Sequence, residues 1–190
     1  MLTFNQRIMK KFLIILLIGA ALVSCRKDVL DLDPISEIGS NEFYSNGEEL
    51  ELATIAIYDG LQAIPLREFA LTEMRSDNTR SKSQEGDWAQ FENYTVVPTN
   101  QQVGVYWTAN YNVVFRANRV LENLEVVNNP TLKNQLEGEA KFNRALAHFN
   151  LVRAYGDVPL LDKVIGPEES DYFDREPVSD VMDFIIQDLI

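Results

Sequence analysis

Residues 137–160 carry the segment EGEAKFNRALAHFNLVRAYGDVPL, which decides the fold class of this chain. Apolar residues in and just before it recur at intervals of three and four, which predicts an amphipathic helix from about Leu132 to Tyr155. Gly156 permits a left-handed helix end, and Pro159 prevents the helix from continuing. The residues expected to face inward are Leu136, Ala140, Leu146, Phe149 and Val152.

Helical periodicity of the same kind extends outward in both directions. It predicts a first helix over about 47–64, a second over about 103–127, and a fourth that begins near Pro177 or Ser179. The expected stripes are Leu50, Ala53, Ile57, Leu61 and Ile64 in the first helix, and Trp107, Tyr111, Val114, Leu121 and Leu124 in the second.

The connections between these helices complete the fold prediction. The turn Asn128-Asn129-Pro130 is expected to end the second helix. Because this turn is short, the second and third helices should form an antiparallel hairpin. Equivalent helix positions recur about every 30 residues, which indicates tetratricopeptide-like pairs. The run up to Ile190 has no stop signal, so we interpret the last helix as truncated, in a fragment or in a shortened gene product. The predicted fold class is all-α.

A polar segment over 65–102 separates the first two helices. It mixes charged residues with aromatic ones, and we expect a long irregular loop there. A connection of this length is unusual inside a compact domain and is typically functional.

The amino-terminal segment is typical of an export signal. Arg7, Lys10 and Lys11 precede an uncharged apolar run over 12–23, and Cys25 follows. The run is shorter than the roughly 20 residues of a membrane-spanning helix. The alternatives are a buried core helix or an N-terminal membrane anchor.

The tetrapeptide Leu22-Val23-Ser24-Cys25 resembles the bacterial lipobox. The resemblance implies cleavage before Cys25 and a lipid on its thiol, which would anchor the protein in a membrane. Cys25 is the only cysteine, so it has no partner for an intrachain disulfide. We therefore expect a signal peptide over 1–24, a lipidated tether over 25–40 and a helical domain over 41–190. The charged start of the tether is either a solvated linker or a sorting signal for surface export.

The formal net charge limits the classes of partner that this protein is expected to bind. Removal of the leader, which holds three basic residues and no acidic one, changes the formal net charge from −12 to −15. Nucleic-acid binding requires a basic face, so it is excluded as an expected function. Apolar residues make up 46% of the chain, enough for a folded core.

The helix over 132–155 also carries a family resemblance. Residues 139–160 are similar to the pattern EA-x-F-x-RA-x-x-x-F-x-LV-x-x-YGDVPL of the SusD/RagB family. Other segments that resemble the family occur in the same order as in its members: Asp31-x-Asp33-Pro34, Trp107-x-x-x-Tyr111, Ala117-Asn118-x-Val120, Arg175-x-Pro177-Val178 and Ile185-x-x-Asp188-Leu189. The resemblance therefore covers nearly the whole chain after the leader.

This resemblance implies a helical lipoprotein without catalytic activity or cofactor. Such proteins lie on the outer face of the Bacteroidetes outer membrane and cap a SusC-like TonB-dependent transporter. They capture glycans or oligosaccharides, and in some cases peptides. Members are longer, so this chain would hold the N-terminal third.

The resemblance also places part of the ligand site in the segment over 65–102. Aromatic rings stack on the apolar faces of sugars, while planar polar groups meet the hydroxyls. The candidate ligand residues are Trp88, Phe91, Tyr94, Asp77, Asn78 and Arg80. Alternatively, Trp88 and Tyr94 only pin the loop to the helices. Trp107 is assigned to helix packing.

Two other functions stay open. A glycan-degrading enzyme needs only a pair of carboxylates, but nothing in the sequence selects two of the 29 acidic residues. No serine-elbow or metal motif appears either. A helical-repeat adaptor would bind protein alone. His148 has no second histidine with which to share a metal, so we expect it packed or exposed. Glu139 and Arg144 are expected to form a polar pair, either buried or solvated.

Overall fold

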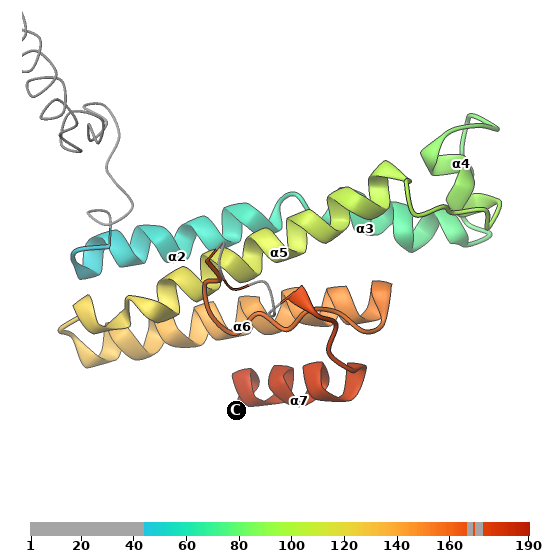
Figure 1. The fold of residues 1–190 in the computed structure, drawn as a ribbon. Coiled ribbons are helices and arrows are strands. Elements are labelled where there is room, and N and C mark those ends of the chain that lie inside the picture. Colours follow the sequence, from blue (N-terminus) through green and yellow to red (C-terminus); the bar gives the residue numbers. More distant parts are fainter. Residues whose placement is uncertain (1–43, 167–168, 170–172) are drawn as a thin grey trace, which may run out of the picture. The chain divides into compact units, whose positions relative to one another are not determined.

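The computed structural model describes residues 44–166, 169 and 173–190, and this part of the chain is helical (Figure 1). The single β-type contact within it is an antiparallel bridge between Val158 and Glu176. The predicted all-α class is therefore confirmed. The helices are α2 (Gly47–Leu61), α3 (Pro65–Leu71), α4 (Asp87–Glu92), α5 (Gln101–Glu122), α6 (Pro130–Tyr155) and α7 (Val178–Leu189), with short 3-10 turns η2 (Glu73–Arg75) and η3 (Leu124–Val126).

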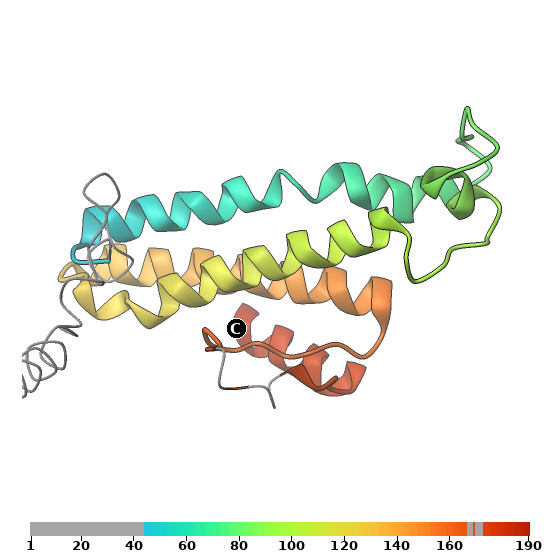
Figure 2. The same cartoon turned by 45° about the horizontal axis from the view of Figure 1, so that its top comes forward.

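The two longest helices, α5 and α6, form the expected antiparallel hairpin. Helix α2 lies along α5, and α7 packs against α6 on the side away from α2 (Figures 1 and 2). The core between α2, α5 and α6 includes Leu50, Ile57, Val113, Val114, Ala117, Leu136 and Ala140, all at most 1% exposed. A methyl group on Gly60 would lie 3.2 Å from Val113, so glycine lets α2 approach α5 closely.

The inward-facing stripe predicted for the first helix is confirmed, although this helix ends earlier than predicted and a second helix, α3, follows it. Helix α2 ends at Leu61 and Pro65 begins α3, because proline suits the first turn of a helix and not its interior. Helix α7 begins at Val178 after Pro177, as predicted.

The turn between α5 and α6 differs from the prediction. Helix α5 ends at Glu122, before η3, and Asn129 caps the start of α6. The Asn129 side chain accepts hydrogen bonds from the backbone N–H groups of Thr131 and Leu132, at 3.0 and 3.3 Å. Pro130 occupies the first helical position, where its missing N–H loses no hydrogen bond.

The stripe predicted to face inward on α6 is wrong in part. Leu136 and Ala140 are buried, Leu146 and Val152 are half-buried, and Phe149 is 39% exposed. Helix α6 packs against α2 and α5 on one side and α7 on the other, so close approach favours small and polar residues there. The fully or nearly fully buried residues of α6 include Asn143, Arg144, Ala145, Ala147, His148 and Leu151.

The expected pair of Glu139 and Arg144 does not form. Residues five apart point about 140° away from each other around a helix, so these side chains meet different neighbours. Glu139 accepts hydrogen bonds from Tyr58 and Gln135, at 3.1 and 2.9 Å, while Arg144 pairs with Asp188.

The segment over 65–102 contains three short helical pieces, α3, η2 and α4, which the sequence pattern did not predict. Its irregular parts lie between these pieces and between α4 and α5. The export signal, Cys25, the tether and Asp31 to Pro34 lie outside the described residues. In the part described, no helix combines the length and hydropathy that a bilayer crossing requires.

Candidate functional site

The candidate ligand segment lies at one end of the helix bundle, where α3, η2 and α4 meet the start of α5 (Figures 1 and 2). Ala70, Met74 and Phe91 are at most 4% exposed and form a small apolar core of their own. Because α3 and α4 share this core, the segment has a fixed base from which its polar connections project.

Trp88 lies at the edge of this small core. It is half-buried, packs against the core and stands beside Phe69, with ring centroids 6.2 Å apart and planes inclined by 48°. Phe69 is itself 40% exposed. One part of the Trp88 ring therefore holds α4 in place, and the remainder is open to solvent.

Phe91 and Tyr94 occupy opposite environments. Phe91 is 2% exposed and lies within the small core, so it supports the segment from below. Tyr94 is 70% exposed and has a positive φ of 57°, while its hydroxyl donates to the carbonyl of Arg75. A tyrosine at positive φ is uncommon, so the surrounding structure must stabilise this backbone conformation.

The three polar candidates, Asp77, Asn78 and Arg80, follow η2 and are exposed. Within the described residues, their side chains make no hydrogen bond or ion pair. Their backbone is fastened nearby, because the N–H of Ser81 donates to Glu92 at 2.7 Å. Asp77, Asn78 and Arg80 thus lie on the same segment as the two rings of Trp88 and Tyr94, but their side chains make no hydrogen bond or ion pair with either ring.

Asn100 joins this segment to the start of α5. Its side-chain amide donates to the carbonyl of Asp87 and to Gln90, both at 2.9 Å. Its side-chain oxygen accepts from the N–H of Gln102 at 2.9 Å, which caps α5. Asn100 is 2% exposed, and its hydrogen bonds fix the position of α4 relative to the start of α5.

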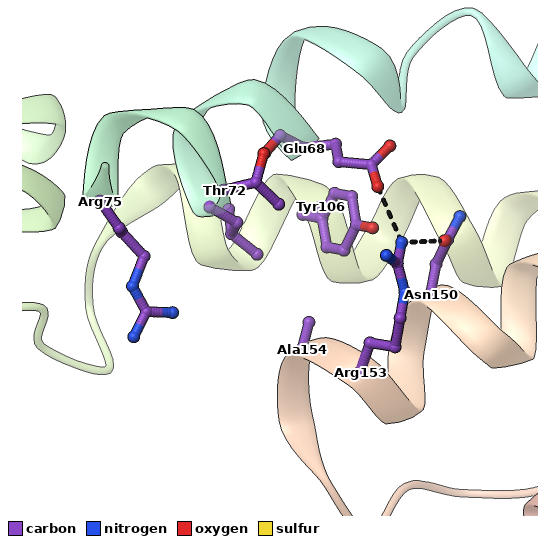
Figure 3. A pocket seen from close by; sticks show the side chains of 8 residues that line it. Glu68, Thr72, Arg75, Tyr106, Asn150, Arg153 and Ala154 are labelled. Carbon is purple, nitrogen blue, oxygen red and sulfur yellow. Dashed lines mark hydrogen bonds and ion pairs between the residues drawn. The ribbon is translucent and has the colours of Figure 1, made fainter. Parts of the chain in front are cut away.

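A cleft that the sequence did not predict lies beside this segment (Figure 3). It has a volume of about 220 Å³ and opens between α3, η2, α5 and α6. Arg153 donates to Glu68 at 2.7 Å and to Asn150 at 2.8 Å across its wall. The lining residues are Glu68, Leu71, Thr72, Arg75, Tyr106, Asn150, Arg153 and Ala154.

The sequence held only weak signals for this cleft. Glu68 and Arg75 belong to the polar segment, but Asn150 and Arg153 lie within the helix motif that we assigned to scaffold. Asn150 and Arg153 are three residues apart and therefore share a helix face, which is the one local sign of a polar surface there. Nothing in the pattern indicates that α3 faces them.

Tyr106 forms the inner wall of the cleft. Burial raises its pKa above the ordinary value, and the negative charge of Glu68 raises it further. Burial likewise raises the pKa of Tyr111 and Tyr155. These hydroxyls therefore stay protonated, which makes them hydrogen-bonding groups and not bases at neutral pH.

His148 is packed, one of the two environments expected for it. It is fully buried beside Phe184, its Nδ1 lies 3.0 Å from the carbonyl oxygen of Arg144, and Nε2 has no hydrogen-bond partner. Burial lowers its pKa to about 4, so the ring is neutral at pH 7. Among the described residues, no three histidine, cysteine or acidic side chains form a group that could hold a metal ion.

Trp107 takes the packing role that we predicted for it. Its ring lies 4.8 Å from Tyr111 and 4.9 Å from Tyr155, between α5 and the end of α6. The Tyr111 hydroxyl donates to the carbonyl of Pro159 at 2.8 Å, which ties the YGDVPL segment to α5.

The motif arginine, Arg144, is the centre of a buried polar network. Its guanidinium donates to both carboxylate oxygens of Asp188, at 2.6 and 2.7 Å. It also donates to Asn118 and to the carbonyl of Asp162, each at 2.7 Å, and stacks over the Phe184 ring at 4.7 Å. These bonds join α5, α6 and α7, so the residues act as scaffold.

Comparison with known proteins agrees with this fold. Residues 28–190 match a family model, SusD-like, described as starch-binding and associating with the outer membrane. A SusD-like protein of Formosa agariphila is 32% identical over 181 residues, and one of Bacteroides ovatus is 25% identical over 183 residues. Each alignment covers 94% of this chain but only 35% and 33% of the relative.

Solved structures show the same relationship. A SusD-like protein from Bacteroides fragilis is 29% identical, with a TM-score of 0.68 over 83% of this chain and 31% of the other. A laminarin-binding SusD-like protein is 28% identical, with a TM-score of 0.64 over 76% and 33%. The chain spans about a third of the length of these relatives. With a family model that matches nearly all of it and a fold shared with solved members, the chain belongs to the SusD-like family.

Proposed function

We propose that this chain belongs to a non-catalytic lipoprotein that captures a glycan or oligosaccharide at the cell surface. The lipid on Cys25 anchors it in the outer membrane, facing the cell exterior. The captured glycan passes to a SusC-like TonB-dependent transporter.

In this proposal the ligand surface consists of Trp88 and Tyr94, with Asp77, Asn78 and Arg80 beside them. The rings stack on sugar faces, and the carboxylate, amide and guanidinium groups meet the hydroxyls. Phe91 contributes from within the small core, where it supports Trp88. A related solved structure is described as laminarin-binding, which supports a glycan as the ligand.

The observation that carries the proposal is the exposed ring of Tyr94 on a segment rich in unpaired polar groups. A ring that served only to pin the loop would be buried, whereas Tyr94 as a residue is 70% exposed and its hydroxyl makes its one hydrogen bond among the described residues, to Arg75. Burial of such a ring against a sugar recovers apolar surface that is now in water.

Affinity electrophoresis in gels that contain different glycans tests the proposal. At least one glycan should retard the protein, and Trp88→Ala should remove that retardation. Phe142→Ala is the matched control, because Phe142 is an aromatic residue that is 55% exposed on α6, away from the segment. Retardation that survives Trp88→Ala excludes this surface, and release of shorter sugars would indicate a hydrolase instead.

The anchor and the partner need separate tests. Labelled palmitate should mark the protein in cells, and Cys25→Ser should abolish the label. A TonB-dependent transporter should co-purify with the protein from outer membranes. Unlabelled wild-type protein contradicts the anchor, and purification without any such transporter contradicts the partner.

A further inference from the structure

The cleft of Figure 3 shares Arg75 with the segment of the proposed ligand surface. The carbonyl of Arg75 accepts the Tyr94 hydroxyl, while its side chain lines the cleft. Arg75 therefore connects the cleft to Tyr94 of the proposed ligand surface.

The charges in the cleft do not cancel. Arg153 is paired with Glu68 at 2.7 Å, so these two charges neutralise each other. The guanidinium of Arg75 has no hydrogen bond or ion pair among the described residues. The side chains that line the cleft therefore carry one positive charge in excess, in a chain whose formal net charge is −12.

The position of Arg75 also favours a bound anion. Figure 3 shows the guanidinium groups of Arg75 and Arg153 on either side of the opening, with the small side chain of Ala154 between them. A free guanidinium presents two parallel donors that match the two oxygens of a carboxylate.

The size and the remaining groups suit a single sugar ring. A volume of about 220 Å³ is below the roughly 300–1,000 Å³ of sites for drug-sized ligands. Thr72 and Glu68 supply a hydroxyl and a carboxylate, whose oxygens can accept hydrogen bonds from sugar hydroxyls.

We propose that this cleft binds a sugar ring that carries a carboxylate, as in a uronic acid. Arg75 holds the carboxylate, and the ring hydroxyls meet Thr72 and Glu68. This inference rests on the proposed glycan-binding function and adds the class of sugar: the preferred glycans are acidic.

A glycan array of matched pairs tests this inference. Each pair consists of a uronate-containing oligosaccharide and its carboxyl-reduced form, which is neutral and keeps the ring stereochemistry. The protein should bind the acidic member about tenfold more tightly, as expected for a charge-assisted hydrogen-bonded pair. Arg75→Gln should remove this preference, so that the two members of each pair bind with the same affinity.

Lys133→Gln is the control, because it removes the same charge from a different helix, where Lys133 pairs with Glu125. Circular dichroism should show that Arg75→Gln melts like the unmodified chain, since the side chain makes no bond that holds the fold. Equal binding of both members of each pair, or a preference that survives Arg75→Gln, overturns the acidic-sugar inference and leaves glycan capture intact. Binding of no glycan overturns both.

Discussion

The rings of Phe69 on α3 and Trp88 on α4 lie 6.2 Å apart and inclined by 48°. An aromatic contact of this kind contributes about 0.5–1.5 kcal/mol and fixes the angle at which Trp88 meets a ligand. Phe69→Ala should therefore weaken glycan binding several-fold while Trp88 is still present. Isothermal titration of the retained glycan measures this, and Phe69→Leu should lose less because it still supports the ring.

A second prediction concerns the buried pair of Arg144 and Asp188, whose side chains are 8% and 5% exposed. Removal of one partner leaves an uncompensated buried charge, so Arg144→Met should destabilise the fold by about 3–5 kcal/mol. Asp188→Leu should cost a similar amount. The double replacement should cost less than the sum, because no charge is then left buried. Denaturant unfolding of all four proteins checks this, and purely additive losses would contradict a direct pair.

Two glycines, one inside α6 and one directly after it, should respond in opposite directions to replacement by alanine. Gly156 ends the helix at φ 74° and ψ −125°, a conformation that strains any other residue, so Gly156→Ala should destabilise the fold by about 1–3 kcal/mol. Gly138 lies inside the helix, with open space where a methyl group would be placed. Gly138→Ala should stabilise by up to about 1 kcal/mol. Thermal melting distinguishes the two, and equal shifts would contradict the role given to Gly156.

The fourth prediction follows from His148, the only histidine in the chain. Its pKa is about 4 in the folded protein, against an ordinary value of 6.5. Between these values the unfolded chain takes up a proton and the folded one does not. The free energy of unfolding should therefore fall as the pH is lowered from 6.5 towards 4, by an amount on the order of 3 kcal/mol. Above pH 6.5 this contribution is constant.

A comparison with His148→Leu isolates this effect from the carboxylates, which titrate in part of the same range. The variant should lose the slope between pH 6.5 and 5 even if its stability at pH 7 differs. Nuclear magnetic resonance gives the pKa directly, since one histidine yields one set of ring signals. A ring that titrates near 6.5 in the folded protein would contradict the burial of His148.

The sequence predicts a helix well where the spacing of its apolar residues and the residues that begin or end it indicate the same boundaries. Leu50 and Ile57 form the buried stripe of α2, and Gly156 ends α6, because these features depend on the local chain alone. The α6 stripe was predicted less well, since a helix packed on two sides buries small and polar residues such as Ala147 and His148. Periodicity of large apolar residues does not detect such a face.

The site was harder to predict, for a related reason. Trp88 and Tyr94 attract notice as aromatic residues in a polar segment, yet only packing shows that Phe91 is buried and Tyr94 exposed. The cleft depends on α3 facing the end of α6, so that Glu68 reaches Arg153 across 85 positions of sequence. A local sequence pattern does not predict a contact between residues so far apart in the chain.

The chain has two tryptophans, and this allows a direct test of glycan capture. Trp88 lies on the proposed ligand surface, while Trp107 is packed between Tyr111 and Tyr155. The two indole N–H signals should be followed by nuclear magnetic resonance while the glycan that retards the protein most is added. We predict that the Trp88 signal shifts to saturation and the Trp107 signal stays in place. A Trp88 signal that does not move when the glycan is saturating would contradict the account.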